Sequence, residues 1–203
     1  AATHEKGCST FTTNAHDIEV ELTMGVAMAD PIKISRLRVS NRSARTRRLS
    51  ITGYVEWALG ANGTVSAPFV VTARDSRTDA LFARNTWRPD FAGDVAFFDM
   101  AGLQQSMCGD RCVFMGALGA VDQPAALGRD DALPDRLGGN LDPCGALQVR
   151  VDLPSDTEIE LVFLLGNAAS ESEAQQLVEK YRAADVAEVL GVALAHWQRL
   201  LDV

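Results

Sequence analysis

The segment from Asp30 to Gly60 constrains the fold more than any other part of the sequence. Two arms of alternating apolar side chains lie on either side of the polar run Asn41–Arg47. The apolar positions are Ile32, Ile34, Leu37 and Val39 in the first arm and Leu49, Ile51, Tyr54 and Val55 in the second. This alternation around a turn rich in Asn, Ser and Arg predicts an antiparallel hairpin with one buried face. The step from Ile34 to Leu37 breaks the alternation and predicts a β-bulge.

Composition narrows the class of protein. A chain of 203 residues, 47% hydrophobic and 23% charged, is typical of one large or two small soluble domains with a sizeable core. The net charge of −8 argues against nucleic acid as a partner, because phosphate binding needs a positive surface. No apolar run approaches the ~20 residues of a membrane helix, and we see no signal peptide at the N-terminus.

Cysteines and histidines are too sparse to predict a metal site. The four cysteines include Cys108 and Cys112, whose spacing differs from the C-x-x-C of redox and zinc sites. With three histidines in the chain, no second pair of zinc ligands is available. We therefore expect reduced thiols, no metal, no cofactor and a cytoplasmic location.

The rest of the chain reads as strands followed by helices. Residues 18–24 alternate strictly, and residues 146–153 and 158–165 form two further strand patterns around Pro154–Asp156. The Gly- and Pro-rich run Gly116–Gly145 predicts a long irregular excursion. After Gly166 the period becomes helical, with a capping box at Ser170 and an apolar stripe from residue 186 to residue 201. We expect about ten strands and two helices, in a large antiparallel sandwich.

The motifs of common hydrolases and nucleotide-binding proteins are missing from the sequence, so we assign no catalytic residue. One interpretation of the arginines in the segment from residue 36 to residue 48 is an anion site. The acidic net charge favours the other, in which they are solvated or paired with neighbouring strands. These residues are Arg36, Arg38, Arg42, Arg45, Arg47 and Arg48. The segment from residue 84 to residue 91 is the best candidate for a carbohydrate contact, because aromatic faces stack on sugar rings while polar groups bond hydroxyls. Its candidate residues are Arg84, Asn85, Trp87, Arg88, Asp90 and Phe91. The competing interpretation, which the sequence alone favours slightly, is a buried loop that plugs the sandwich.

Several short segments of the sequence are distinctive enough to indicate a resemblance to a known protein family. They are Asp30–Leu37 (DPIKISRL), Arg48–Gly60, Ala67–Thr72, Ala80–Trp87 (ALFARNTW), Val95–Asp99, Gly109–Arg111 and Leu141–Gln148 (LDPCGALQ). Between Phe11 and Gly166 the chain resembles the β-sandwich that precedes the catalytic barrel in phosphorylases of glycoside hydrolase family 94. The likeness is strongest to the phosphorylase-like C-terminal region of cyclic β-1,2-glucan synthases.

The resemblance implies a mainly β, galactose mutarotase-like super-sandwich over residues 1–166, without its first strands. Residues 167–203 would then be a helical linker toward an (α/α)6 barrel beyond Val203. That barrel carries the catalytic residues of the family, so none is placed on this chain. The implied partners are the barrel of the same polypeptide and a β-glucan oligosaccharide, and a homodimer is compatible with this reading. The parent protein could also be attached to an inner membrane, with this region on the cytoplasmic side.

Three functions remain open at this stage. The resemblance favours an accessory sandwich that shapes the substrate site of a glycoside phosphorylase or cyclic β-1,2-glucan synthase and is inactive alone. A self-standing carbohydrate-binding module is the first alternative. A mutarotase-like sugar epimerase is the second, and it would need a His/Glu acid–base pair in a cleft of the sheet.

Overall fold

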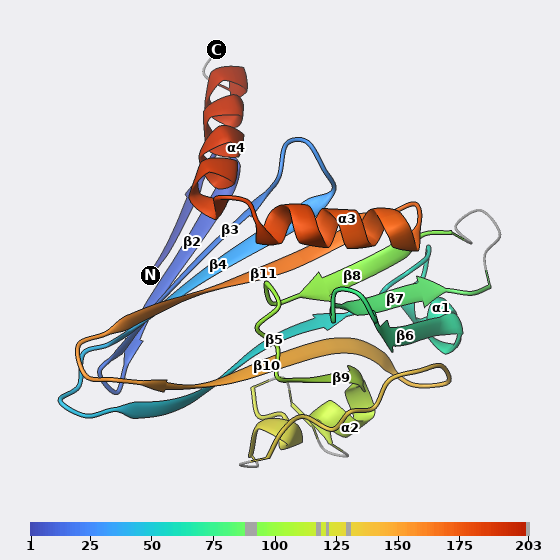
Figure 1. Ribbon diagram of the computed structural model, residues 1–203, viewed down its shortest axis with the longest axis horizontal. Coiled ribbons are helices and arrows are strands. Elements are labelled where there is room, and N and C mark those ends of the chain that lie inside the picture. Colours follow the sequence, from blue (N-terminus) through green and yellow to red (C-terminus); the bar gives the residue numbers. More distant parts are fainter. Residues whose placement is uncertain (88–92, 117–118, 121, 129–130, 202–203) are drawn as a thin grey trace.

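The chain folds into two antiparallel β-sheets with helices at the C-terminus (Figure 1). The computed structural model describes residues 1–87, 93–116, 119–120, 122–128 and 131–201. The strands are β1 (Ala2–Glu5), β2 (Cys8–Ala15), β3 (Ile18–Val26), β4 (Ile32–Asn41), β5 (Arg47–Glu56), β6 (Val70–Arg74), β7 (Leu81–Asn85), β8 (Val95–Asp99), β9 (Ser106–Asp110), β10 (Pro143–Leu153) and β11 (Glu158–Ala168). The helices are α1 (Gly63–Ser66), α2 (Arg111–Met115), α3 (Glu171–Arg182) and α4 (Val186–Leu201), with 3₁₀ turns at Ala67–Phe69 and Ala125–Gly128.

The two sheets differ in size. The larger one has eight strands in the order β1-β2-β3-β4-β11-β8-β7-β6, and the smaller one has three in the order β5-β10-β9. All pairings are antiparallel in the described part of the chain. The predicted mainly β sandwich with C-terminal helices is therefore confirmed.

The predicted hairpin between residues 30 and 60 is wrong in its pairing. Both arms are strands, but β4 pairs with β3 and β11, whereas β5 pairs with β10 in the other sheet. The polar run between them is an arch from one sheet to the other. Asn41, fully buried, holds this arch: its side-chain NH₂ donates to the carbonyl oxygens of Arg45, Leu153 and Pro154 at 2.8–2.9 Å. The last two acceptors belong to the arch from β10 to β11, so one side chain supports both crossings.

The bulge predicted after Ile34 is also wrong. β4 pairs without a register shift with β3 on one side and with β11 on the other. The apolar residues of β4 move from one face of the strand to the other along its length, because the C-terminal helices cover one face near its start and the small sheet covers the other face farther along. Ile32 and Ile34 pack under the C-terminal helices, while Leu37 points between the sheets.

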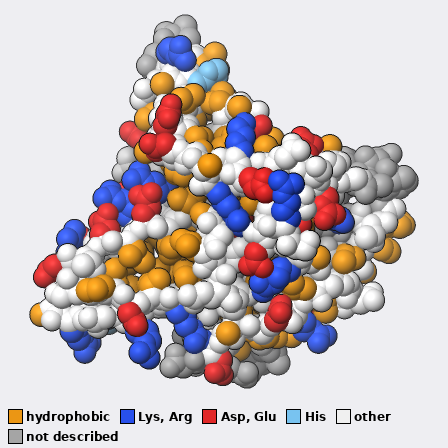
Figure 2. All heavy atoms as spheres, in the orientation of Figure 1, with side chains coloured by type: hydrophobic (Ala, Val, Ile, Leu, Met, Phe, Trp, Pro, Cys, Tyr) orange, Lys and Arg blue, Asp and Glu red, His pale blue; other side chains and the backbone are white. Residues whose placement is uncertain are grey.

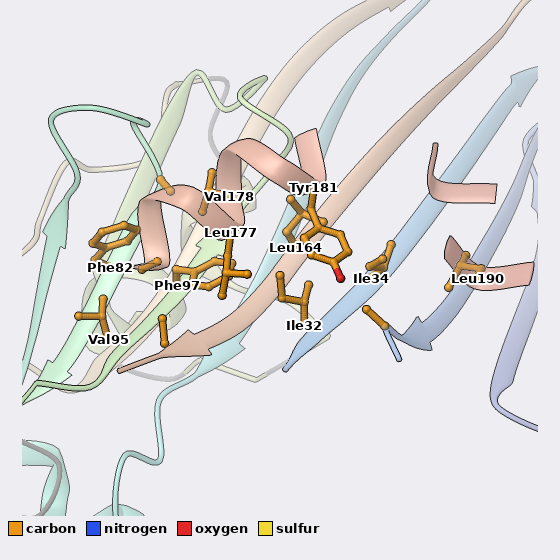
Figure 3. Packing of buried hydrophobic residues seen from close by; sticks show 14 of the residues in the cluster. Ile32, Ile34, Phe82, Val95, Phe97, Leu164, Leu177, Val178, Tyr181 and Leu190 are labelled. Atoms are coloured by element: carbon orange, nitrogen blue, oxygen red, sulfur yellow. The ribbon is translucent and has the colours of Figure 1, made fainter. Parts of the chain in front are cut away.

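Two hydrophobic cores result. One fills the space between the sheets and includes Met107, Leu147 and Phe163. The other lies on the opposite face of the large sheet, where Leu177, Val178 and Tyr181 of α3 cover Phe82, Phe97 and Leu164 (Figure 3). Ser170 caps α3 as predicted, since its hydroxyl accepts the backbone N–H of Glu173 at 3.2 Å. α3 is thus fixed to the sheet along its whole length.

One long side of the sandwich is closed by the segment from Leu133 to Gly139, which we call the strap. The backbone N–H of Gly109 in β9 donates to the Arg136 carbonyl at 2.8 Å. The N–H of Thr72 in β6 donates to the Gly138 carbonyl at 3.0 Å. The strap therefore bonds an edge strand of each sheet. It belongs to the excursion that the sequence predicted as irregular.

Candidate functional site

Trp87 is an exposed aromatic residue in the described part of the candidate carbohydrate-contact segment. It follows β7, and its indole stacks on the ring of Phe69, with centroids 4.7 Å apart and an angle of 20° between the planes. The side chain is 57% exposed. One face of the indole therefore rests on Phe69 and leaves the rest of the ring for solvent or a ligand.

Backbone contacts hold this pair of rings in place. The N–H of Thr86 donates to the Phe69 carbonyl at 3.0 Å, and the N–H of Trp87 donates to the side-chain oxygen of Asn85 at 3.0 Å. Asn85 is 7% exposed and donates to the carbonyl of Leu59 at 2.6 Å. We call Trp87 with its support on Phe69 the tryptophan platform.

Arg84 points to the helix-covered face of the sheet. Its guanidinium pairs with Glu171 in the first turn of α3 at 2.6 Å, and both side chains are partly exposed. The pair borders a hollow of about 270 Å³, whose apolar wall includes Val71 and Phe82. A planar cation paired with a carboxylate offers donors and acceptors that suit vicinal hydroxyls.

The three predicted contact residues that the structure describes have different environments. Asn85 is occupied in holding the loop, Arg84 is paired with Glu171, and Trp87 is exposed. Arg88, Asp90 and Phe91 lie outside the described residues. The sequence analysis did not predict that Phe69 supports Trp87 or that Glu171 pairs with Arg84. Both contacts depend on the pairing of β6 with β7 and on the position of α3, which the sequence pattern did not give. A correct strand pairing would have placed Phe69 beside the end of β7.

The described part of the chain brings together no candidate metal centre. It contains no group of three or more His, Cys, Asp or Glu side chains that could hold a metal ion. His4 bonds Ser9, while His16 lies in the turn before β3 and His196 packs edge-on against Trp197. The cysteines are free, and burial raises the pKa of the Cys144 thiol.

Arg36 and Arg38 of β4, and Arg42 directly after it, are paired with carboxylates of the neighbouring strands β3 and β11. The exposed or half-buried pairs are Arg36–Glu160, Arg38–Glu158, Arg38–Glu21 and Arg42–Glu19. Such pairs contribute little to stability and leave no concentration of positive charge for an anionic ligand. Buried Asp99 is different, since it is fully enclosed and accepts two hydrogen bonds from Arg182.

The family model of the glycosyl hydrolase 94 supersandwich domain matches residues 1–184. The chain belongs to this family. It is therefore a domain associated with carbohydrate-active enzymes. The two antiparallel sheets of the structure agree with the supersandwich that the family model describes.

Curated relatives are much longer than this chain. The cyclic β-(1,2)-glucan synthase NdvB of Rhizobium meliloti is 31% identical over 194 residues, which are 96% of this chain and 7% of the relative. The cellobionic acid phosphorylase of Neurospora crassa is 27% identical over 179 residues, 81% of this chain and 21% of the relative. In both relatives the matched region is one part of a larger protein.

Solved structures support the fold alone. A bacterial glucoamylase complexed with acarbose matches all of this chain and 28% of its own, with a TM-score of 0.63 and 8% identity. A protein assigned as a kojibiose phosphorylase from the human microbiome matches 94% of this chain and 23% of its own, with a TM-score of 0.53 and 8% identity.

No helix in the described residues is long and apolar enough to cross a membrane.

Proposed function

We propose that this chain is the accessory sandwich of a β-glucan-active enzyme of the phosphorylase and cyclic glucan synthase type. In this role it carries no catalytic residue and contributes a sugar contact to the substrate site of the enzyme. The family match and the small share of each relative that it covers support an accessory role. The tryptophan platform is the observation that carries the sugar contact.

The platform suits a neutral sugar ring. The C–H groups on one face of a pyranose pack on an indole, and this packing needs a ring that is both exposed and fixed. Trp87 meets both conditions, because 57% of it is exposed and Phe69 supports it from behind. Arg84 on β7 and Glu171 on α3 line one hollow together with Thr86, the residue before Trp87, and in this proposal they bond hydroxyls along the same chain of sugars.

The partner in this proposal is a helical catalytic domain of the same polypeptide. Residues 167–203 would lead to it, and α4 rises from the large sheet with the C-terminus at its tip (Figure 1). Leu190 and Ala193 of α4 are buried against the sheet, whereas Leu200 and Leu201 are each 55% exposed. An apolar end of this kind supports a contact with a further domain.

Calorimetry tests the sugar contact. The purified chain is titrated with β-1,2-gluco-oligosaccharides, and with β-1,3 and β-1,4 oligomers as controls of linkage. We expect selective binding of the β-1,2 oligomers, weakened by about threefold to tenfold in Trp87→Ala, because a stacked ring contributes about 0.5–1.5 kcal/mol. Trp197→Ala, which removes an indole from α4, should leave the affinity unchanged. Equal affinity of wild type and Trp87→Ala, or no binding at all, would contradict the platform as a sugar contact.

A further inference from the structure

The two C-terminal helices are held to the large sheet in different ways. α3 buries side chains along its length, and an ion pair joins its last turn to β8, since Arg182 bonds the buried Asp99 carboxylate. Lys180 and Tyr181 also bond one carboxylate, that of Asp30, at 2.6 Å and 2.8 Å. Polar and apolar contacts together therefore fix α3 in its place.

α4 has a smaller contact with the sheet. Its buried residues are Leu190 and Ala193, whereas Val192 is 56% exposed and Leu200 is 55% exposed. Figure 1 shows α3 lying along the sheet and α4 rising away from it toward the C-terminus, and Figure 2 shows hydrophobic side chains at the surface of α4. A helix of 16 residues is only marginally stable in water without tertiary contacts. The few contacts of α4 therefore decide whether it stays on the sheet.

Two glycines receive α4, and we call Gly7 and Gly25 the helix seat. A Cβ at Gly25 of β3 would lie 2.7 Å from the side chain of Leu190 and 3.1 Å from the sulfur of Cys8. A Cβ at Gly7, between β1 and β2, would lie 2.5 Å from the indole of Trp197. Because such close contacts tolerate little displacement, the seat fits α4 in one position only.

The segment Ala183–Asp185 separates the two helices. The N–H of Ala183 donates to the Glu179 carbonyl at 3.2 Å and closes the last turn of α3. The side chain of Asp185 accepts the N–H of Ala187 at 2.9 Å and caps the first turn of α4. Each helix thus has its own cap, so α4 can move without unwinding α3.

We propose that α4 is a pivoting arm, which leaves the helix seat at the segment Ala183–Asp185 while α3 and both sheets stay folded. The tight seat and the separate caps give two discrete positions, seated and released. Release withdraws Leu190 from the thiol of Cys8, with which it shares a buried cluster, and moves the C-terminal end of α4 relative to the sandwich. This inference is independent of the sugar contact at Trp87.

The native cysteines allow a direct test. Cys8 is 8% exposed beside Leu190, whereas Cys108 and Cys144 are 0% exposed in β9 and β10, and Cys112 is exposed. The wild-type chain is labelled with a maleimide at pH 8, and the rate at each cysteine is read by mass spectrometry. We expect Cys8 to react more slowly than Cys112 but at least about tenfold faster than Cys108 and Cys144, which need a wider opening of the fold. Low concentrations of urea should change the Cys8 rate little, because release of α4 exposes little surface.

Two tryptophan variants show whether the reaction of Cys8 depends on α4. Trp197→Ala removes the side chain that packs on Gly7. It should speed the labelling of Cys8 by at least about threefold and leave the Cys108 rate unchanged, because only a local contact is weakened. Trp87→Ala is the matched control, since it removes an exposed indole at the end of β7 and should change neither rate.

Three results overturn the proposal. Equal labelling of Cys8 and Cys108 in the wild type would mean that α4 leaves the sheet only when the sandwich opens. An unchanged Cys8 rate in Trp197→Ala would mean that the reagent reaches the thiol with α4 seated. If the variant does not fold, amide hydrogen exchange of the wild-type chain decides the question. The α4 amides are then expected to exchange at least about tenfold faster than those of α3, and equal protection of the two helices would overturn the proposal.

Discussion

The two long sides of the sandwich end in different ways. On the closed side, the strap bonds β9 through Gly109 and β6 through Thr72, and Arg136 pairs with Asp110 at 2.9 Å. On the other long side, which we call the open side, β5 pairs with β10 alone among the described strands, and a mainly apolar groove of about 300 Å³, lined in part by Leu22, Leu37 and Phe163, lies next to it. Both sides pose the same physical problem, an unpaired strand edge next to a hydrophobic core. The chain closes the edge on one side with its own strap, and on the open side the edge of β5 has no strand partner among the described residues.

The largest effect is expected from the buried ion pair that joins β8 to α3. Asp99 is 0% exposed and is bound by Arg182 at 2.6 Å and 2.9 Å. Arg182→Ala leaves this carboxylate buried without its cation, and the expected loss of unfolding free energy is about 3–5 kcal/mol by urea denaturation. Arg77→Ala is the control, because the Arg77–Glu179 pair is exposed and should contribute less than about 1 kcal/mol. Equal losses in the two variants would contradict the difference between buried and exposed pairs.

The tight contact between β9 and the strap predicts the next effect. A Cβ at Gly109 would meet the Thr72 hydroxyl and the Leu137 side chain. Because both neighbours are fixed by the strap, Gly109→Ala should reduce the unfolding free energy by about 1–3 kcal/mol. Gly191→Ala has open space around the new methyl group and lies inside α4, so it should stabilise by about 0.5–1 kcal/mol. A neutral Gly109→Ala would mean that the closed side is not tightly packed.

The open side should accept a similar substitution more easily. A Cβ at Gly53 would meet the Phe163 ring at 2.5 Å and the Phe98 ring at 2.8 Å. Both rings border the groove and can shift toward it, so Gly53→Ala should reduce the unfolding free energy of this chain by about 1 kcal/mol, less than Gly109→Ala. The comparison is read from denaturation curves of the two variants side by side. A larger loss for Gly53→Ala would reverse the proposed order of the two sides.

A smaller effect is expected from pH at the turn before β4. The pKa of Asp30 is lowered chiefly by a hydrogen bond from Lys180, at 2.6 Å, and also by one from Tyr181. A carboxyl with a lowered pKa stabilises the fold above its unfolded pKa of about 4, and this stability is lost as the pH falls through its lower folded value. Lys180→Met should therefore lower the Tm at pH 6 but have little effect on it near pH 2. The same change in Tm at both pH values would contradict this assignment.

The sequence pattern predicted where the strands lie better than it predicted which strands pair with one another. Period-two alternation located β3, β10 and β11, and both arms of the segment around Asn41 are strands. A hairpin and an arch need the same polar turn, so the pattern could not show that β4 and β5 belong to different sheets. The deciding contact comes from Leu153 and Pro154, which bond the Asn41 side chain from more than a hundred residues away.

The sugar contact at residues 84–91 stays a prediction, and the structure adds the geometry of the described residues in this segment. Aromatic and polar residues near residue 87 pointed to a sugar contact, and the structure shows that Trp87 is exposed and supported by Phe69. Local sequence could not distinguish the structural role of Asn85 from the exposed position of Trp87. The groove beside β5 was not foreseen, because an uncovered surface depends on which sheet each strand joins.

Amide hydrogen exchange of residues 1–203, measured by NMR, tests the difference between the two sides most directly. The account predicts slow exchange at Thr72 and Gly109, whose N–H groups are bonded to the strap, and fast exchange at every second amide of β5. The β4 amides serve as the internal reference for a strand that is paired on both sides. Uniform protection along β5 in the monomeric chain, or fast exchange at Thr72 and Gly109, would contradict the account.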